Sequence, residues 1–159
     1  MYNTSWNDFI GKNSNNLTKA FEDLARYLFR KKYDVSYALP YFKNHPGNET
    51  AVIKRGDEVI GFQAKYFENE IDATNIIHSI QLAKKWCPEQ TLLVIYTNKE
   101  FGIPKTIGNV TSQRQDNIQK VAKDLGLRLE WMFGDNILDV VKETPVAYDI
   151  YLKSATYRV

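Results

Sequence analysis

The chain has 159 residues, of which 43% are hydrophobic and 25% charged, and this composition excludes a disordered segment and fits one globular domain. The net charge of +2 is too small to indicate nucleic-acid binding by itself, so such binding would need a local patch. Cys87 is the single cysteine, which excludes a disulfide framework and fits a reducing cytosol. The N-terminus lacks an apolar signal core, and the longest apolar run, Leu92 to Tyr96, is far too short to span a bilayer. We therefore expect a cytoplasmic protein with no membrane partner.

The first third of the chain predicts a helix and a strand behind a polar segment. Residues 1–16 are rich in Asn and Ser, so we interpret them as an N-terminal polar arm, with a single domain over residues 17–159. An apolar stripe predicts a helix from Leu17 to Lys32. The aromatic and β-branched stretch from Tyr33 to Tyr41 predicts a strand, which Pro40 closes.

A hairpin is the next expected element. A short run from Thr50 to Lys54 is followed by a turn signal and by a second run from Val59 to Tyr66. Apolar residues alternate along the second run, so its period of 2 predicts a strand with one face on a core. Gln63 and Lys65 are two residues apart and point to the same side of that strand.

The remainder alternates between helices and strands. A helix capped by Asp72 and running to Trp86 precedes a near-continuous apolar run, which is typical of a strand covered on both faces. The later elements that we expect are a strand over 91–97, a helix over 113–125, a strand over 127–132, a helix over 136–142 capped by Asp135, and a helical turn over 147–152. This order predicts an α/β domain with a central mixed sheet flanked by helices.

Glu49 joins Gln63 and Lys65 in the candidate site only under a geometric condition. Residues that face each other in a hairpin share a face, so Glu49 opposite Lys65 requires a three-residue loop, Gly56 to Glu58, or a bulge. A two-residue turn at Gly56-Asp57 would put Glu49 on the other face.

The residue types of this group suit metal-assisted chemistry. A carboxylate and an amide oxygen are ligands for a hard divalent cation such as Mg²⁺, and a lysine can orient water or stabilise charge on a phosphate. The alternative is an exposed strand end with an ordinary cross-strand pair between Glu49 and Lys65.

The stretch resembles the core of the PD-(D/E)xK nuclease superfamily, most closely its Mrr-type restriction endonuclease branch, in which Q-x-K replaces the usual E-x-K. Gln63-Ala64-Lys65 stands at a predicted strand end, and Glu49 lies fourteen residues earlier, where the family more often has Asp. Glu22 in the first helix matches the place of a further family acid, although an ion pair with Arg26 explains it equally well. The family's αβββαβ core matches the elements expected from Leu17 to Thr97.

The resemblance implies a restriction-endonuclease-like domain that hydrolyses DNA phosphodiester bonds with Mg²⁺ or Mn²⁺, in restriction or phage defence. Glu49, Gln63 and Glu22 would hold the metal, and Lys65 would position or activate water. It also implies DNA, further domains of a longer chain and a second copy of the chain as partners. The alternative is a module that kept the nuclease fold, lost the chemistry, and binds DNA or a partner NTPase domain.

Basic residues outside this group are candidates for DNA contacts. Lys84, Lys105 and Arg114 lie on the second helix, the long loop and the third helix, where they could follow a phosphate backbone. Acids are interspersed, so a mixed solvated surface explains them as well. His45 and His78 lack metal-ligand spacing, and the chain has no phosphate-binding glycine motif.

Overall fold

The computed structural model describes residues 4–35, 47–102 and 112–153, and within them it is an α/β fold around a four-stranded mixed sheet. The strand order is β1-β2-β3-β4, where β1 is antiparallel to β2 and the other neighbours are parallel. The strands are β1 (Ile53–Arg55), β2 (Glu58–Lys65), β3 (Leu92–Thr97) and β4 (Arg128–Met132). The predicted α/β class with a mixed sheet is therefore confirmed.

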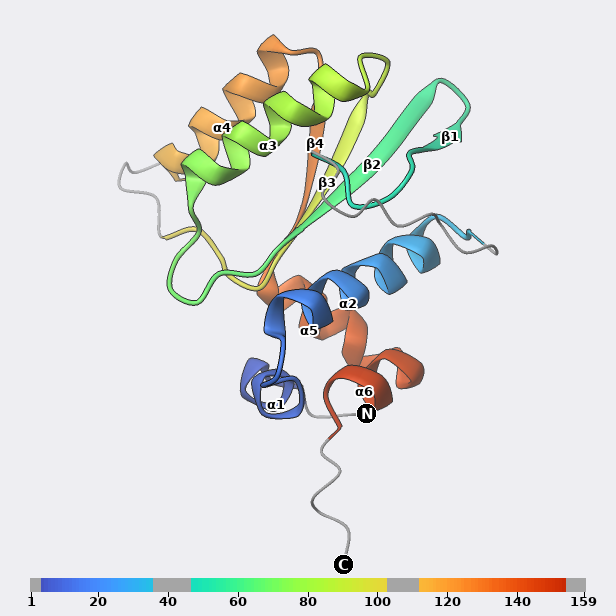
Figure 1. The fold of residues 1–159 in the computed structure, drawn as a ribbon, viewed down its shortest axis with the longest axis vertical. Coiled ribbons are helices and arrows are strands. Elements are labelled where there is room, and N and C mark those ends of the chain that lie inside the picture. The colour runs from blue at the N-terminus through green and yellow to red at the C-terminus, as the bar shows by residue number, and fades with distance from the viewer. Residues whose placement is uncertain (1–3, 36–46, 103–111, 154–159) are drawn as a thin grey trace, which may run out of the picture.

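Helices cover both faces of the sheet (Figure 1). One face packs against α1 (Trp6–Lys12), α2 (Leu17–Lys32), α5 (Gly134–Lys142) and α6 (Pro145–Tyr151), and the other against α3 (Ala73–Trp86) and α4 (Gln113–Asp124). Alternate residues of the strands supply the two cores: Val94 belongs to the first and Leu93 to the second. Every residue of β3 is buried, as its near-continuous apolar run predicted. In the part of the chain that the structure describes, no helix combines the length and apolarity needed to cross a bilayer.

Two helices form where their local signals predicted them. The Oδ1 atom of Asn16 accepts a hydrogen bond of 3.1 Å from the N–H of Lys19 at the start of α2. The Oδ1 atom of Asp72 accepts one of 3.1 Å from the N–H of Asn75 at the start of α3. The two side chains accept hydrogen bonds from backbone N–H groups that have no partner within the helix. Asn16 and Asp72 therefore mark the amino ends of α2 and α3.

The predicted N-terminal arm differs from the structure, because residues within it form α1 and join the core. The Ser5 hydroxyl caps this helix by accepting from the N–H of Asp8 at 3.2 Å. The ring of Phe9 is fully buried and makes an edge contact with the ring of Phe21 in α2. Lys12 donates to the carbonyl oxygen of Asp149 at 2.7 Å. One large aromatic side chain thus anchors a segment whose composition is polar.

The strand predicted from Tyr33 does not begin there. Tyr33 ends α2, and Asp34 adopts the left-handed conformation with φ of 51°. The N–H of Val35 donates to the carbonyl of Arg30 at 2.9 Å, and the N–H of Asp34 donates to that of Lys31 at 3.3 Å. This pattern is a Schellman motif, which reverses the chain after a helix. The rest of the predicted strand, and His45, lie outside the described residues.

Candidate active site

The hairpin between β1 and β2 has a two-residue turn. Arg55 pairs with Glu58 and Ile53 with Ile60, so Gly56 and Asp57 alone connect the strands. The three-residue loop, one of the two arrangements that would place Glu49 opposite Lys65, is therefore absent. Continued regularly, this register would place Glu49 opposite Ala64, on the face that Gln63 and Lys65 do not share.

Glu49 reaches the site because the regular pairing stops before it. Ala51 and Val52 lie outside the strand, and the N–H of Glu49 donates to the carbonyl of Phe62 at 3.0 Å. This bond is offset by two residues from the register of β1, so the regular pairing is interrupted between Glu49 and Ile53. The Glu49 carboxylate accepts a hydrogen bond from the backbone N–H of Ala64. The carboxylate therefore lies along the backbone edge of β2, where groups from both faces of the sheet can reach it.

Gly47 and Asn48 hold this edge segment against α3. Gly47 has φ of +89°, and a Cβ atom there would lie 2.2 Å from the backbone nitrogen of Ala83 in α3. Only glycine satisfies both the backbone conformation and the close approach. The Asn48 amide lies against Gly61, where a Cβ atom would lie 2.0 Å from its Oδ1 atom. The position of Glu49 is thus set by packing between α3 and β2.

Gln63 presents a buried oxygen without a partner. Its side chain is 1% exposed, and its Nε2 atom donates to the carbonyl oxygen of Gly47. A carbonyl can only accept, so this bond fixes which end of the amide carries the nitrogen. The Oε1 atom has no hydrogen-bond partner. A buried amide oxygen without a partner costs on the order of 1–3 kcal/mol, which a ligand at the site would offset.

Glu49 and Lys65 are mutually coupled and both are shifted in pKa. Burial raises the pKa of Glu49 to about 7, helped by the nearby Glu22, whereas Lys65 and the Ala64 hydrogen bond lower it. Burial lowers the pKa of Lys65, opposed by the negative charges of Glu49, Glu22 and Asp72. Glu22 therefore lies within electrostatic range of both groups, although α2 covers the opposite face from α3. Its neighbour Asp23 pairs with Arg26 at 3.8 Å.

These residues fit a hard divalent cation. The carboxylates of Glu49 and Glu22 and the unpartnered Oε1 atom of Gln63 offer oxygen atoms, the type of ligand that Mg²⁺ and Mn²⁺ prefer. No group of three or more His, Cys, Asp or Glu residues converges anywhere in the described ranges. A site here would therefore depend on the amide oxygen and on water to complete its coordination.

The predicted DNA-contact residues lie in different places. Lys84 donates to the carbonyl oxygen of Gln90 at 2.7 Å, just before β3 begins, at the opposite end of the parallel strands from Lys65. Arg114, at the start of α4, pairs with Glu70 at 3.7 Å in the loop that follows β2. Lys105 falls outside the described residues. Asp72, which the sequence marked only as a helix cap, is a further charge that acts on Lys65.

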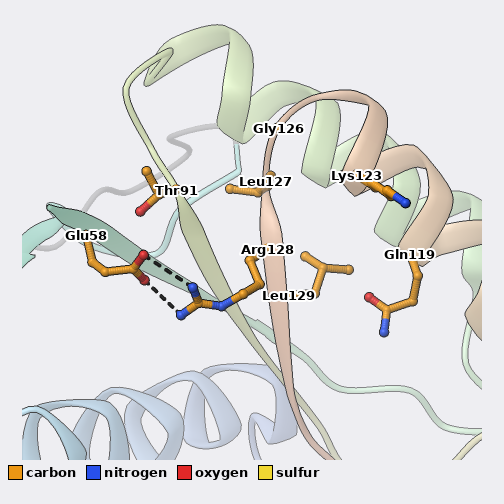
Figure 2. Close-up of a pocket in the computed structure, with 8 residues that line it drawn as sticks. All are labelled: Glu58, Thr91, Gln119, Lys123, Gly126, Leu127, Arg128 and Leu129. Carbon is orange, nitrogen blue, oxygen red and sulfur yellow. Dashed lines mark hydrogen bonds and ion pairs between the residues drawn. The ribbon is translucent and has the colours of Figure 1, made fainter.

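A pocket at the amino ends of the strands is distinct from this site (Figure 2). The guanidinium of Arg128 spans the start of β3 to reach the Glu58 carboxylate, with contacts of 2.8 and 3.3 Å. Lys123 and Gln119 of α4 also line the pocket. Its charged strand residues are paired with each other and lie at the solvent surface, which is typical of a structural contact.

No protein-family model matches the chain, and no curated protein matches its sequence.

Proposed function

We propose that this domain is a Mg²⁺- or Mn²⁺-dependent deoxyribonuclease of the PD-(D/E)xK type, acting in restriction or phage defence. The observation that carries the proposal is the unpartnered, buried Oε1 atom of Gln63, beside the coupled pair of Glu49 and Lys65. An amide oxygen, a carboxylate and a lysine at one strand end suit metal-assisted phosphodiester hydrolysis.

Each residue would have a separate role. Glu49, Gln63 and Glu22 would hold the cation, which when bound would polarise the phosphate and activate water. The Lys65 ammonium would stabilise negative charge on the phosphate or orient the attacking water. Because burial lowers its pKa, Lys65 gives up a proton more readily than an exposed lysine and can assist in proton transfer.

Plasmid cleavage with Mg²⁺ or Mn²⁺ tests the proposal. We expect Lys65→Ala to lose roughly 100-fold or more in rate, as for the removal of an acid–base or charge-stabilising group. Lys123→Ala is the matched control, since it removes a lysine at the opposite end of the strands. Equal cleavage by Lys65→Ala and wild type, or no cleavage by either with any metal, contradicts the proposal.

The alternative is a nuclease-fold module that binds DNA or a partner domain without chemistry. The absence of a third clustered acid among the described residues favours it. Isothermal titration calorimetry separates the two, because the binding module takes up no Mn²⁺ and binds DNA equally well with Lys65→Ala.

A further inference from the structure

Three aromatic rings gather at the carboxyl ends of β3 and β4. The aromatic cluster consists of Phe101, Trp131 and Phe133. The rings of Trp131 and Phe133 are nearly parallel, with an interplanar angle of 9° and centroids 5.3 Å apart. Phe101 stands edge-on to both, at 5.3 Å from Trp131 and 5.7 Å from Phe133. Trp131 and Phe133 lie two residues apart at the end of β4, and the fold brings Phe101, from the segment after β3, against both.

The aromatic cluster is not closed off from solvent. Phe9, Phe21, Phe29 and Phe62 in the core are fully buried, whereas all three rings of the aromatic cluster are partly exposed. Trp131 lies on β4, which has only one neighbouring strand in the described sheet. All three rings also pack against the second hydrophobic core, so the partly exposed remainder of each ring adds aromatic surface at this edge of the sheet.

A cation accompanies the rings. The Arg114 guanidinium lies 5.8 Å from the centroid of the Phe101 ring. Its ion pair with Glu70 joins side chains that are 41% and 83% exposed, so exchange of Glu70 for a phosphate costs little. The Glu100 carboxylate nearby accepts from the N–H of Asp135 at 2.6 Å, where the amino end of α5 offsets its charge.

The aromatic cluster lies at the same end of the sheet as the candidate active site. Lys65 pairs with Thr97, and Tyr96 pairs with Met132, the residue before Phe133. Asn98 connects the two regions, since its amide exchanges hydrogen bonds of 2.8 and 2.9 Å with the backbone of Phe67. Ligands of α/β sheets bind beyond the carboxyl ends of parallel strands.

We propose that the aromatic cluster and Arg114 bind an unpaired nucleotide of single-stranded DNA. The base stacks on the rings, and Arg114 contacts a neighbouring phosphate. A base inside a duplex has both faces covered by its neighbours, so this surface favours a single strand or a frayed end over intact duplex. In the proposed nuclease, the aromatic cluster would also direct the bound strand towards Lys65. That second role rests on the proposed nuclease function, whereas the binding of the nucleotide does not.

Fluorescence anisotropy with 5′-fluorescein-labelled oligo(dT), in EDTA so that no cleavage occurs, tests the inference. We expect wild type to bind the single strand more tightly than a duplex of equal length. Trp131→Ala should weaken single-strand binding about tenfold or more, since stacking on an aromatic ring contributes about 1–3 kcal/mol per base. Arg114→Gln should reduce both the affinity and its dependence on salt.

Trp86→Ala is the matched control. Trp86 is 59% exposed at the end of α3, at the opposite end of the strands, so its loss should leave binding unchanged. If Trp131→Ala does not fold, Trp131→Leu replaces it as the test variant, because leucine keeps an apolar side chain but removes the ring. In a Trp6→Phe/Trp86→Phe background, oligo(dT) should quench the fluorescence of Trp131.

Equal binding of oligo(dT) by wild type and a folded Trp131 variant overturns the inference, as does equal affinity for duplex or an absence of quenching. The nuclease proposal can fail separately. If Lys65→Ala cleaves like wild type while Trp131→Ala loses binding, the stacking surface stands and the assigned chemistry does not.

Discussion

Two buried glutamines show the difference between the two ends of this sheet. Gln90, at the amino end, is 0% exposed, and both polar atoms of its side chain form hydrogen bonds. Its Oε1 atom accepts from Asn48 at 2.8 Å, and its Nε2 atom donates to Asn48 and to the Leu92 carbonyl, both at 3.1 Å. Gln63, towards the carboxyl end, is 1% exposed and leaves its Oε1 atom without a partner.

The same side chain therefore has two roles. A buried amide with all its bonds made stabilises the fold, and we interpret Gln90 in this way. A buried amide with an unpaired oxygen opposes folding unless something else binds that oxygen. The shifted pKa values of Glu49 and Lys65 occur at the end where Gln63 lies. Clusters of shifted groups are typical of functional sites.

The largest expected effect is on activity, from Gln63→Leu. Loss of this proposed metal ligand should reduce Mg²⁺-dependent plasmid cleavage at least about 100-fold. The free energy of unfolding in urea should stay within about 1 kcal/mol of wild type, because removing the unpaired oxygen offsets losing the bond to Gly47. If the Gln63→Leu variant cleaves as fast as wild type, Gln63 has only a structural role, as Gln90 does.

Gln90→Leu should have the opposite profile. The substitution removes the partners of both Asn48 side-chain atoms and of the Leu92 carbonyl, so we expect a loss of about 2–3 kcal/mol in the free energy of unfolding. Urea denaturation monitored by circular dichroism measures it. A smaller loss than that of Gln63→Leu would remove the distinction between the two amides.

Metal binding should depend on the ionisation of Glu49. Its pKa of about 7 means that the cation must displace a proton below neutrality. The Mn²⁺ affinity should therefore rise about tenfold per pH unit from about pH 5 to about pH 7, and then level off. Isothermal titration calorimetry across this range measures the slope.

Variants of the neighbouring charges sharpen this test in metal-free protein. Lys65→Met should raise the pKa of Glu49, because the ammonium lowers it, and Glu22→Gln should reduce it, because the second carboxylate raises it. Carboxyl-carbon NMR titration follows Glu49 directly. Shifts of the same sign in both variants would contradict the arrangement described.

The smallest expected effect comes from Arg128→Gln at the amino end. This exposed pair with Glu58 should contribute at most about 1 kcal/mol to the free energy of unfolding, and its loss should leave cleavage unchanged. A large loss of activity would show that the pocket in Figure 2 takes part in the function.

Local signals predicted much of the fold. The helix over Ala73–Trp86 follows from its Asp72 cap and its apolar stripe, both of which lie in the sequence itself. The strand β3 follows from its uninterrupted apolar run. Burial of Phe9 was not predictable in the same way, because one ring in a polar segment has no periodicity to reveal it.

The sequence predicted a set of candidate site residues but not their geometry. Pairing rules correctly linked Gln63 with Lys65 on one face of β2. They could not locate Glu49, because its position depends on the shifted register and on the contact of Gly47 with α3. The aromatic cluster was also out of reach, since Phe101 and Trp131 meet only through the parallel pairing of β3 and β4.

The Gly47 carbonyl has a consequence for how this motif can change through evolution. It accepts from the amide nitrogen of the Gln63 side chain, which lies sixteen positions further along the chain. The substitution Gln63→Glu would turn an acceptor towards that carbonyl, and two oxygens would repel each other there. An ionised glutamate at this position is therefore disfavoured by this backbone, unless a second change redirects the Gly47 carbonyl.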